Sequence, residues 1–417
     1  MQTTLENKNL LGINGSGRIG KLTLWYHISV GHFDGYVVNV GREIGKSLDD
    51  MIHSVLTDST YGEMGKFIYG YRGKDIDVQI TDREKGIVNI DGVPVKFLRS
   101  ERNPKNIDWA KHRVRLVVDC TGAFVDPTVD ANSAKGSLRG HLESGAQHVI
   151  LSAPFKIKDS SQKMPPDSKM FVYGINHTEF NPTNDHILSA ASCTTTGLAH
   201  MVKPLLESEH TSRILTASMA TIHAATNTQS ILDSMPKAGA SDLRKNRSVF
   251  NNIILSTTGA AKALEKVLPE IQRIGFMADS VRIPTNTVSL ILLNVTFHSP
   301  MKENKEPLIN KDLINDIFRE AAKGSQKDLL FYTDKQNVSS CLQGIEAAVI
   351  IEGYQTHTRT GYMSVPKEVL TAYGLDESKQ IEIPVTHAKI FGWYDNEFGS
   401  YVYSLGKLAI YVDKQIH

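Results

Sequence analysis

The residue best suited to covalent chemistry is Cys193, which lies in the run SAASCTTTGLAH, after an apolar segment and before a helix-forming stretch. A thiol at the start of a helix is close to backbone N–H groups and to the positive end of the helix dipole, and both favour the thiolate. Ser192 and Thr194 add hydroxyl groups on either side of the sulfur. This stretch alone fits a nucleophile and a small buried core residue equally well.

A partner for the thiol follows at His223, the histidine that ends the strand-like segment TASMATIHA. An imidazole beside a thiol can activate it and then act as a general acid or base. A lone histidine is more often a satisfied polar residue, but Thr226 and Thr228 follow in an open turn, with hydroxyl groups suited to phosphate oxygens. These neighbours favour a site.

Two further segments are suited to binding anions. STTGAAK at 256–262 opens a helix with hydroxyl caps, and Arg282 carries its charge within an apolar strand, where it needs an anionic partner. Each alone fits a structural cap or a core ion pair. Together with Cys193 and His223 they indicate a thiol site with seats for anions.

A second kind of chemistry is suggested by LLGINGSGRIG, in which Gly15, Gly17 and Gly20 form the pattern GxGxxG between a strand and the helical KLTLWYHI. Such glycines allow a sharp turn and close approach of a dinucleotide pyrophosphate to a helix N-terminus. The alternative is a glycine-rich turn without a ligand. The strand-turn-helix context favours the dinucleotide.

The residues after the second strand bear on which dinucleotide is bound. An acidic residue about 20 positions after the glycines usually holds the adenosine ribose 2′-hydroxyl. The sequence there is VVNVGR, with Val40 at the strand tip and Arg42 just beyond it, where an arginine suits a 2′-phosphate. Glu43 could still turn inward. The pattern favours NADP or dual use.

The elements that must position these residues form two patterns. Short apolar strands at 9–13, 36–40, 114–119 and 148–152 alternate with helical stretches, which predicts a parallel α/β sheet. From about residue 214 the strands are longer and β-rich (TASMATIHA, SVRIPTNTVSLILLNVTF and EAAVIIEGY), with helices at 258–274 and 308–323. This predicts a second, α+β domain with a larger, partly antiparallel sheet. The segment 397–417 is expected to be helical.

Composition excludes several classes of function. The chain of 417 residues has 46 basic and 45 acidic side chains, so no nucleic acid or membrane is needed as a partner. Three cysteines without a CxxC pair indicate neither zinc nor a disulfide framework, and fifteen scattered histidines predict no metal site. His141, Glu143 and His148 are expected on a solvated helix and its exit turn. Without a leader or a long apolar run, we expect a soluble cytoplasmic protein.

The order and spacing of many motifs resemble the phosphorylating glyceraldehyde-3-phosphate dehydrogenase family. The motifs are INGSGRIG, DCTGAF at 119–124, SAP at 152–154, ASCTT at 191–195, HAATNTQ at 223–229, STTGAAKALEKVLPE at 256–270, VRIPTNTVS at 281–289 and WYDNEFG at 393–399. The resemblance implies a doubly wound (Rossmann) NAD(P)-binding domain, residues 1–192 completed by 397–417, and an α+β catalytic domain with a large mixed sheet, residues 193–396. It also implies glyceraldehyde 3-phosphate and inorganic phosphate as substrates, NAD or NADP as cofactor, and a homotetramer.

The same resemblance assigns roles to individual residues. Cys193 becomes the nucleophile and His223 the base. The substrate's own phosphate falls to Thr226, Thr228 and Arg282, and inorganic phosphate to Ser192, Thr194, Thr258 and Gly259. The implied cofactor residues are Gly15, Gly17, Arg18, Ile19, Gly20, Asn39, Arg42, Thr121, Gly122, Ser152 and Asn396. Of these, Arg18 and Ile19 are expected to pack against the dinucleotide, Thr121 and Gly122 to line its adenine side, and Asn396 to bond the nicotinamide amide.

Departures from the family pattern indicate a divergent member. They are Val40 in place of an acid, Gly197 in place of a second cysteine, Ser400 where a tyrosine is expected, an altered loop at 230–252, and longer segments at 73–80, 156–168 and 342–390. Pro204 is expected to kink or end the helix after Cys193. The alternatives are an erythrose-4-phosphate dehydrogenase of the same fold and a catalytically idle relative that binds nucleic acid or protein.

Overall fold

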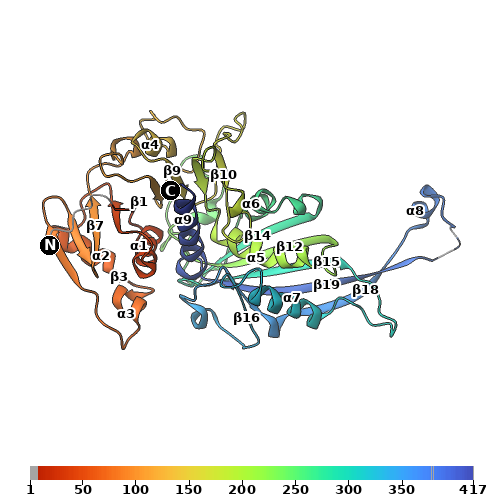
Figure 1. The fold of residues 1–417 in the computed structure, drawn as a ribbon. Helices are drawn as coiled ribbons and strands as arrows, with labels where there is room; N and C mark the ends of the chain where they lie inside the picture. Colours follow the sequence, from red (N-terminus) through yellow and green to blue (C-terminus); the bar gives the residue numbers. More distant parts are fainter. Residues whose placement is uncertain (1–7, 377, 379, 417) are drawn as a thin grey trace. The chain divides into compact units, whose positions relative to one another are not determined.

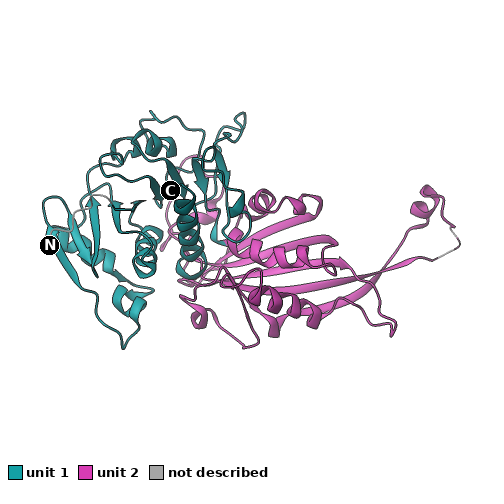
Figure 2. Cartoon of the chain, viewed as in Figure 1, with its two compact units in different colours: residues 1–193, 397–417 teal, residues 194–396 magenta. Residues whose placement is uncertain are grey.

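The structure, a computed structural model, describes residues 8–376, 378 and 380–416. It divides into two compact units, one made of residues 1–193 and 397–417 and the other of residues 194–396 (Figure 2). The expectation that no leader is present concerned the N-terminal segment, of which residues 1–7 lie outside the described residues. Across the described residues, no helix combines the length and apolar character that a membrane span requires.

Unit 1 is built on a mostly parallel sheet, as predicted (Figure 1). In the described residues its order is β10-β11-β9-β8-β1-β2-β7-β6-β5, antiparallel only at β7-β6 and β6-β5. The strands are β1 (Leu10–Asn14), β2 (Gly35–Asn39), β5 (Val78–Asp82), β6 (Ile87–Ile90), β7 (Val93–Leu98), β8 (Leu116–Asp119), β9 (His148–Leu151), β10 (Ser168–Met170) and β11 (Ile187–Ser189). Every residue of β1, β2, β8 and β9 is buried, because helices and loops cover both faces of a parallel sheet.

The chain enters this sheet at its centre. It goes from β1 to β2, continues to β5 at the edge of the sheet, comes back through β6 to β7 beside β2, and then crosses to the other side of β1 to form β8 and β9. Such a reversal opens a crevice at the carboxyl ends of the strands, where doubly wound folds bind ligands. The helices of this unit are α1 (Arg18–Val30), α2 (Leu48–Leu56), α3 (Met64–Tyr69), α4 (Leu138–Glu143) and α9 (Tyr403–Gln415), with a small sheet of β3 (Thr57–Asp58) and β4 (Gly62–Glu63).

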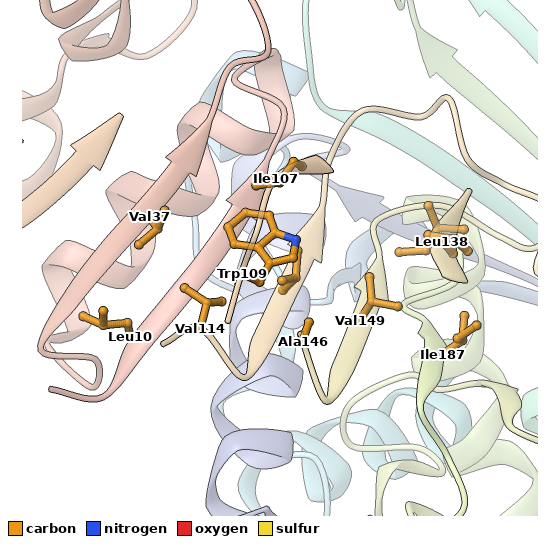
Figure 3. Close-up of a cluster of buried hydrophobic side chains, with 11 residues drawn as sticks. Leu10, Val37, Ile107, Trp109, Val114, Leu138, Ala146, Val149 and Ile187 are labelled. Carbon is orange, nitrogen blue, oxygen red and sulfur yellow. The ribbon is translucent and has the colours of Figure 1, made fainter. Parts of the chain in front are cut away.

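One face of the sheet is covered by a cluster centred on Trp109 (Figure 3). Its side chains come from β1, β2, β8, β9 and β11, from the first residue of α4 and from loops. Trp109 is fully buried, and burial of a large apolar side chain of this kind contributes about 1.5–3 kcal/mol. The cluster therefore holds together the strands whose carboxyl ends surround the crevice.

The last helix belongs to unit 1. Gly406 of α9 faces the ring of Tyr26 on α1 so closely that a Cβ there would lie 2.1 Å from Tyr26 Cε1. Asp413, near the end of α9, accepts hydrogen bonds from Asn9 Nδ2 at 2.7 Å and from His32 Nε2 at 2.8 Å. The C-terminal helix is thus held by residues from the beginning of the chain.

Unit 2 contains a large mixed sheet, so the predicted fold class is confirmed. Within the described residues its order is β13-β14-β12-β15-β19-β17-β16, with β18 also paired to β19. The strands are β12 (Ile214–Ala224), β13 (Ile254–Ser256), β14 (Gly275–Ile283), β15 (Ser289–His298), β16 (Leu330–Thr333), β17 (Val349–Glu352), β18 (His357–Ser364) and β19 (Glu382–Tyr394), and the helices are α5 (Cys193–Glu207), α6 (Ala260–Val267), α7 (Lys311–Lys323) and α8 (Lys367–Ala372). Pairs β12-β14 and β16-β17 are parallel and the others antiparallel.

Three details of unit 2 bear on the predictions. Pro204 lies inside α5, and the helix continues to Glu207, so the proline does not end it early. The long segment 342–390 contains a two-stranded arm, in which β18 pairs with β19 and α8 lies at the far end (Figure 1). Gly197 is buried within α5, and a Cβ at this position would lie 3.3 Å from Ile291 Cδ1. The side chain of a cysteine there would be closely confined.

Candidate active site and dinucleotide pocket

The glycine pattern forms the tight turn between β1 and α1. Gly15 has a positive φ of 95°, and its N–H donates to Asn39 O at 2.8 Å. A Cβ on Gly20 would lie 1.8 Å from Gly15 O, so only glycine allows α1 to pack this close to the turn. Nothing lies within 4 Å of an ideal Cβ on Gly17. The turn therefore has the close backbone approach that a pyrophosphate site requires.

A cavity of about 580 Å³ lies beside this turn, at the carboxyl ends of β1, β2 and β8. It is lined by Asn14, Gly15, Asn39, Val40, Gly41, Arg42, Arg102, Asn103, Thr121, Ala123, Phe124, Ala134 and Lys135. Asn39 Oδ1 is buried and has no hydrogen-bond partner among the described residues, so it is an acceptor that a ligand could satisfy. The cradle and its position in the fold fit the adenosine half of a dinucleotide.

A buried polar network supports the floor of the cavity. Asp119 Oδ2 accepts from Asn14 Nδ2 at 2.8 Å and lies 3.0 Å from His141 Nε2. Trp109 Nε1 can only donate, and it lies 2.8 Å from His141 Nδ1, so this nitrogen is the acceptor and Nε2 carries the proton. Asn14 Oδ1 in turn accepts from Asn39 Nδ2 at 2.8 Å. The chain of bonds fixes the side chains at the ends of β1, β2 and β8.

This network corrects one expectation. His141 is fully buried and His148 is 3% exposed, so neither lies on a solvated surface. Burial lowers the pKa of His148. The expectation failed because His141 is satisfied by Trp109 and Asp119, which come from other segments of the chain.

The remaining cofactor candidates of unit 1 follow β8 or begin α1. Thr121 donates from N and Oγ1 to Asp119 Oδ1, at 3.1 and 2.7 Å; Gly122 has a φ of 64°; and Ser152 N donates to Asp119 O at 2.9 Å. Ile19 lies in the first turn of α1. The Arg18 guanidinium is paired with Asp58 and Glu397.

Cys193 is the first residue of α5, at the helix end that favours a thiolate. Ala191 before it has a positive φ of 58°, which is uncommon for a residue with a side chain. Tyr401 Oη donates to Ala191 O at 3.0 Å and holds this turn. Burial raises the pKa of Tyr401 well above its ordinary value, so its hydroxyl stays a donor. Ser192 lies between the strained residue and the cysteine.

His223 is placed by the sheet. It lies opposite Arg282 in the parallel register of β12 and β14. His223 Nδ1 lies 2.8 Å from Ala224 O, and Arg282 Nη1 donates to the same carbonyl at 3.1 Å and contacts Nδ1. The ring tautomer decides which neighbour Nδ1 bonds: with the proton on Nδ1 the imidazole donates to Ala224 O, and Nε2 is left as the basic nitrogen. Burial first, and then the charge of Arg282, lower the pKa of His223 to about 3.

Tyr394 joins the start of α5 to this histidine. Its hydroxyl lies 2.9 Å from Thr194 Oγ1 and 2.7 Å from Thr221 Oγ1, and all three side chains are buried. Its ring meets the His223 ring edge-on, with 5.9 Å between centroids and 83° between planes. Sequence reasoning missed Tyr394, although the motif WYDNEFG contains it.

Asn396 is also connected to the strand of His223. Ser289 Oγ accepts from Ala224 N at 3.0 Å and donates to Asn396 Oδ1 at 2.9 Å. With its oxygen held in this way, the amide of Asn396 offers Nδ2 as a donor to a ligand. Ser289 is a second residue that the sequence did not single out.

The predicted phosphate residues lie in two loops of unit 2. Thr226 Oγ1 lies 2.9 Å from Thr228 Oγ1, and Gln229 contacts both hydroxyls at 3.0 Å. The neighbouring Ala225 N donates to Thr285 O at 3.0 Å, which ties this loop to the one that follows Arg282. Thr258 Oγ1 accepts from Ala260 N at 3.2 Å, and Gly259 is the N-cap of α6. The described residues contain no group of three or more metal-ligating side chains placed to hold an ion.

Comparison with known proteins matches both units. Residues 10–127 match the family model described as glyceraldehyde 3-phosphate dehydrogenase, NAD binding domain, and residues 192–369 match the model of the C-terminal domain of the same enzyme. The chain is 32% identical to a glyceraldehyde-3-phosphate dehydrogenase of Streptomyces coelicolor, covering 97% of this chain and 99% of the relative. It is also 32% identical to the cytosolic enzyme of Chlamydomonas reinhardtii, covering 99% of this chain and 98% of the relative.

Proposed function

The chain belongs to the glyceraldehyde-3-phosphate dehydrogenase family of NAD-dependent phosphorylating oxidoreductases, and from this premise we propose that it oxidises glyceraldehyde 3-phosphate to 1,3-bisphosphoglycerate. The observation that carries the proposal is the setting of His223. Its Nδ1 lies 2.8 Å from Ala224 O, and we infer that it donates to this carbonyl, which leaves Nε2 as the basic nitrogen; Arg282 lies alongside to hold an anion. This arrangement suits a base that works on a phosphorylated substrate.

Cys193 and His223 divide the covalent chemistry. The Cys193 thiol gives its proton to His223 Nε2, its sulfur attacks the aldehyde carbon, and the carbonyl oxygen takes that proton to give a thiohemiacetal, with the start of α5 favouring the thiolate. His223 Nε2 takes the proton of the thiohemiacetal hydroxyl as the hydride leaves that carbon, and a thioester remains on Cys193. An oxygen of inorganic phosphate then attacks the thioester carbon, the carbon–sulfur bond breaks, and the acyl phosphate leaves a thiolate behind.

Anion binding is shared between the two loops of unit 2. Arg282, Thr226 and Thr228 hold the phosphate already on the substrate, and their placement around the strand end of His223 supports this assignment. Thr194, Thr258 and Gly259, with Ser192, receive inorganic phosphate. The N-terminus of α6 and the hydroxyl of Thr258 are suited to an anion.

The dinucleotide, when bound, supplies the hydride acceptor. The turn from Gly15 to Gly20 would hold its pyrophosphate, and the cavity beside Asn39 and Thr121 its adenosine half. Asn396 Nδ2 would donate to the nicotinamide amide.

We also propose a homotetramer in the cytoplasm. Exposed apolar side chains gather in and after the 230–252 loop, at Ile231, Leu232, Met235, Phe250 and Ile253. Apolar groups in this number are typical of a surface that a partner subunit covers. Sedimentation equilibrium would measure the mass of the assembly.

One set of rate measurements tests the reaction. Glyceraldehyde 3-phosphate should be oxidised with NAD or NADP, and phosphate omission should suppress turnover after the thioester forms. Erythrose 4-phosphate is the comparison substrate. A higher kcat/KM for erythrose 4-phosphate than for glyceraldehyde 3-phosphate would identify it as the preferred substrate. Nucleic-acid binding without turnover of either aldehyde would contradict the proposal.

A further inference from the structure

We infer that the adenosine end of the cavity in unit 1 is a binding site for a 2′-phosphate, formed by Arg42, Arg102 and Lys135, so that the chain prefers NADP. The inference rests on the proposed function, because it assigns the cofactor of that reaction. It adds Arg102 and Lys135, which no sequence pattern indicated.

The three cations come from three separate loops that hydrogen bonds tie together. Arg42 follows β2, Arg102 follows β7, and Lys135 precedes α4, and all three line the same cavity. Arg102 Nε donates to Gly41 O at 3.2 Å, and Asn39 Nδ2 donates to Glu101 O at 2.9 Å. These bonds join the loops after β2 and β7.

The third loop is attached in the same way. Asn103 Nδ2 donates to Ser133 O at 3.2 Å, and the side chains of Lys105 and Asn132 are hydrogen bonded. Gly41 makes the close approach of the first two loops possible. It has a φ of 70°, and a Cβ there would lie 3.0 Å from Glu101 O. The hydrogen bonds between the three loops therefore bring all three cationic residues to the lining of one cavity.

Negative charge is missing from this part of the cavity. No aspartate or glutamate is among the described residues that line it. Glu43, the acid that might have turned inward, is paired with Arg99 at 2.9 Å instead. Arg102 Nε is bound to Gly41 O, which leaves its two Nη nitrogens for a ligand. Arg42, Arg102 and Lys135 are exposed, so water can solvate them in the free protein, and three cations lining one cavity attract an anionic ligand.

Position identifies the anion. In this fold the pyrophosphate lies on the turn between β1 and α1, and the adenosine ribose lies at the end of β2. Arg42 and Arg102 follow β2 and the neighbouring β7, so they are beside the ribose rather than the pyrophosphate. Val40 occupies the strand tip, where an acid would bond the 2′-hydroxyl and repel a phosphate. The group that fits is a phosphate on the ribose 2′-oxygen.

The test is a binding measurement on the full chain, by calorimetry, with adenosine 2′,5′-bisphosphate and 5′-AMP as probes. We expect the bisphosphate to bind at least about tenfold more tightly, with a difference that shrinks as salt is added. Three variants, Arg42→Ala, Arg102→Ala and Lys135→Ala, should each lower the affinity for the bisphosphate by about tenfold. Their affinity for 5′-AMP should stay unchanged. Lys111→Ala, which removes an exposed charge from the same unit, is the matched control.

Val40→Asp is the reciprocal variant and should reverse the preference of the two probes. Equal affinity of the wild type for both probes, or variants that weaken both alike, would overturn the inference. If either outcome is found while the chain still oxidises the aldehyde with NAD, the inference fails but the proposed function stands. Conversely, tight bisphosphate binding without aldehyde oxidation by either dinucleotide would overturn the proposed function alone.

Discussion

Arg282 and His223 lie opposite each other on parallel strands, and a nitrogen of each lies within hydrogen-bond distance of one carbonyl oxygen, that of Ala224. The arginine therefore does two things at once. Its charge can attract an anion, and the same charge disfavours the protonated imidazole, so that burial and Arg282 together lower the pKa of His223 to about 3. A base of this kind stays neutral throughout the physiological pH range.

Arg282→Gln should separate these two effects. Loss of the neighbouring charge raises the pKa of His223, so the variant loses activity at a higher pH on the acid side than the wild type does. The KM for the phosphorylated aldehyde should also rise by about tenfold or more, because a charge-assisted contact is removed. The measurement is the pH–rate profile together with an NMR titration of His223. Lys327→Gln, an exposed change in the same unit, is the control; an unmoved titration would refute the coupling.

Cys193→Ser should lower aldehyde oxidation by at least about a thousandfold, because a serine hydroxyl is a far poorer nucleophile at neutral pH. Dinucleotide affinity, measured by calorimetry, should stay unchanged. Cys341 is exposed and lies outside the proposed site, so Cys341→Ser is the matched control and should keep full activity. Near-normal turnover in the Cys193 variant would exclude the thioester mechanism.

Gly17→Ala and Gly20→Ala should differ in their effects on the free energy of unfolding and on dinucleotide affinity. A methyl group on Gly20 meets Gly15 O at 1.8 Å, so this variant should lose about 1–3 kcal/mol of unfolding free energy and most of its dinucleotide affinity. Gly17 has open space and a φ of −70°, so its variant should fold normally and lose affinity only where the methyl meets the ligand. Urea unfolding and calorimetry measure the two quantities. The same loss of stability in both variants would contradict this account of the turn.

The parts of the structure that sequence patterns predicted are those set by local chemistry. The strands around 10–14, 35–39, 116–119 and 148–151 are continuous apolar runs, and the glycines of the turn have steric roles that only glycine can fill. The mixed sheet of unit 2 was evident from its long alternating strands. The division into functional domains at 192/193 and 396/397, and the roles of the site residues, stay predictions.

What the patterns missed depends on partners far away in the chain. Tyr394 is 200 positions from Thr194 and acts through its hydroxyl, a role that no local spacing indicates. His141 was expected on a solvated helix, yet it is buried, and Trp109 and Asp119 satisfy both of its ring nitrogens. β18 was not predicted either, because HTRTGYMS is exposed along most of its length and has no apolar face.

The burial of His27 makes the free energy of unfolding depend on pH in the acid range. It is fully buried beside Phe33 and Tyr36, neither ring nitrogen has a hydrogen-bond partner among the described residues, and burial lowers its pKa from 6.5 to about 3. The unfolded chain takes up a proton near pH 6.5 and the folded chain only near pH 3, so stability present above 6.5 is lost as the pH falls between these values. A pKa that differs by one between the folded and unfolded chain corresponds to about 1.4 kcal/mol of unfolding free energy.

His27→Phe keeps an aromatic ring in place and removes the titrating group. The variant should therefore lose less unfolding free energy than the wild type between pH 7 and pH 4, by a few kcal/mol at most. Trp25 and Trp109, both in unit 1, report the transition by fluorescence. The pKa of His223 is also lowered in the folded protein, so a smaller slope remains in the variant. Identical pH dependence in both proteins would show that His27 is not the source.

The return of α9 to α1 gives the protein an order of assembly on the ribosome. Tyr26, Asn9 and His32 are made first, but Gly406 and Asp413, which they contact, are made last. The residues of unit 2 emerge in between, about 200 of them, which at roughly 5–20 residues per second takes about 10–40 s. Through that interval the ring of Tyr26 on α1 lacks the helix residue that packs against it. The fold of this unit is therefore complete only after the residues of the other unit and then α9 have been made.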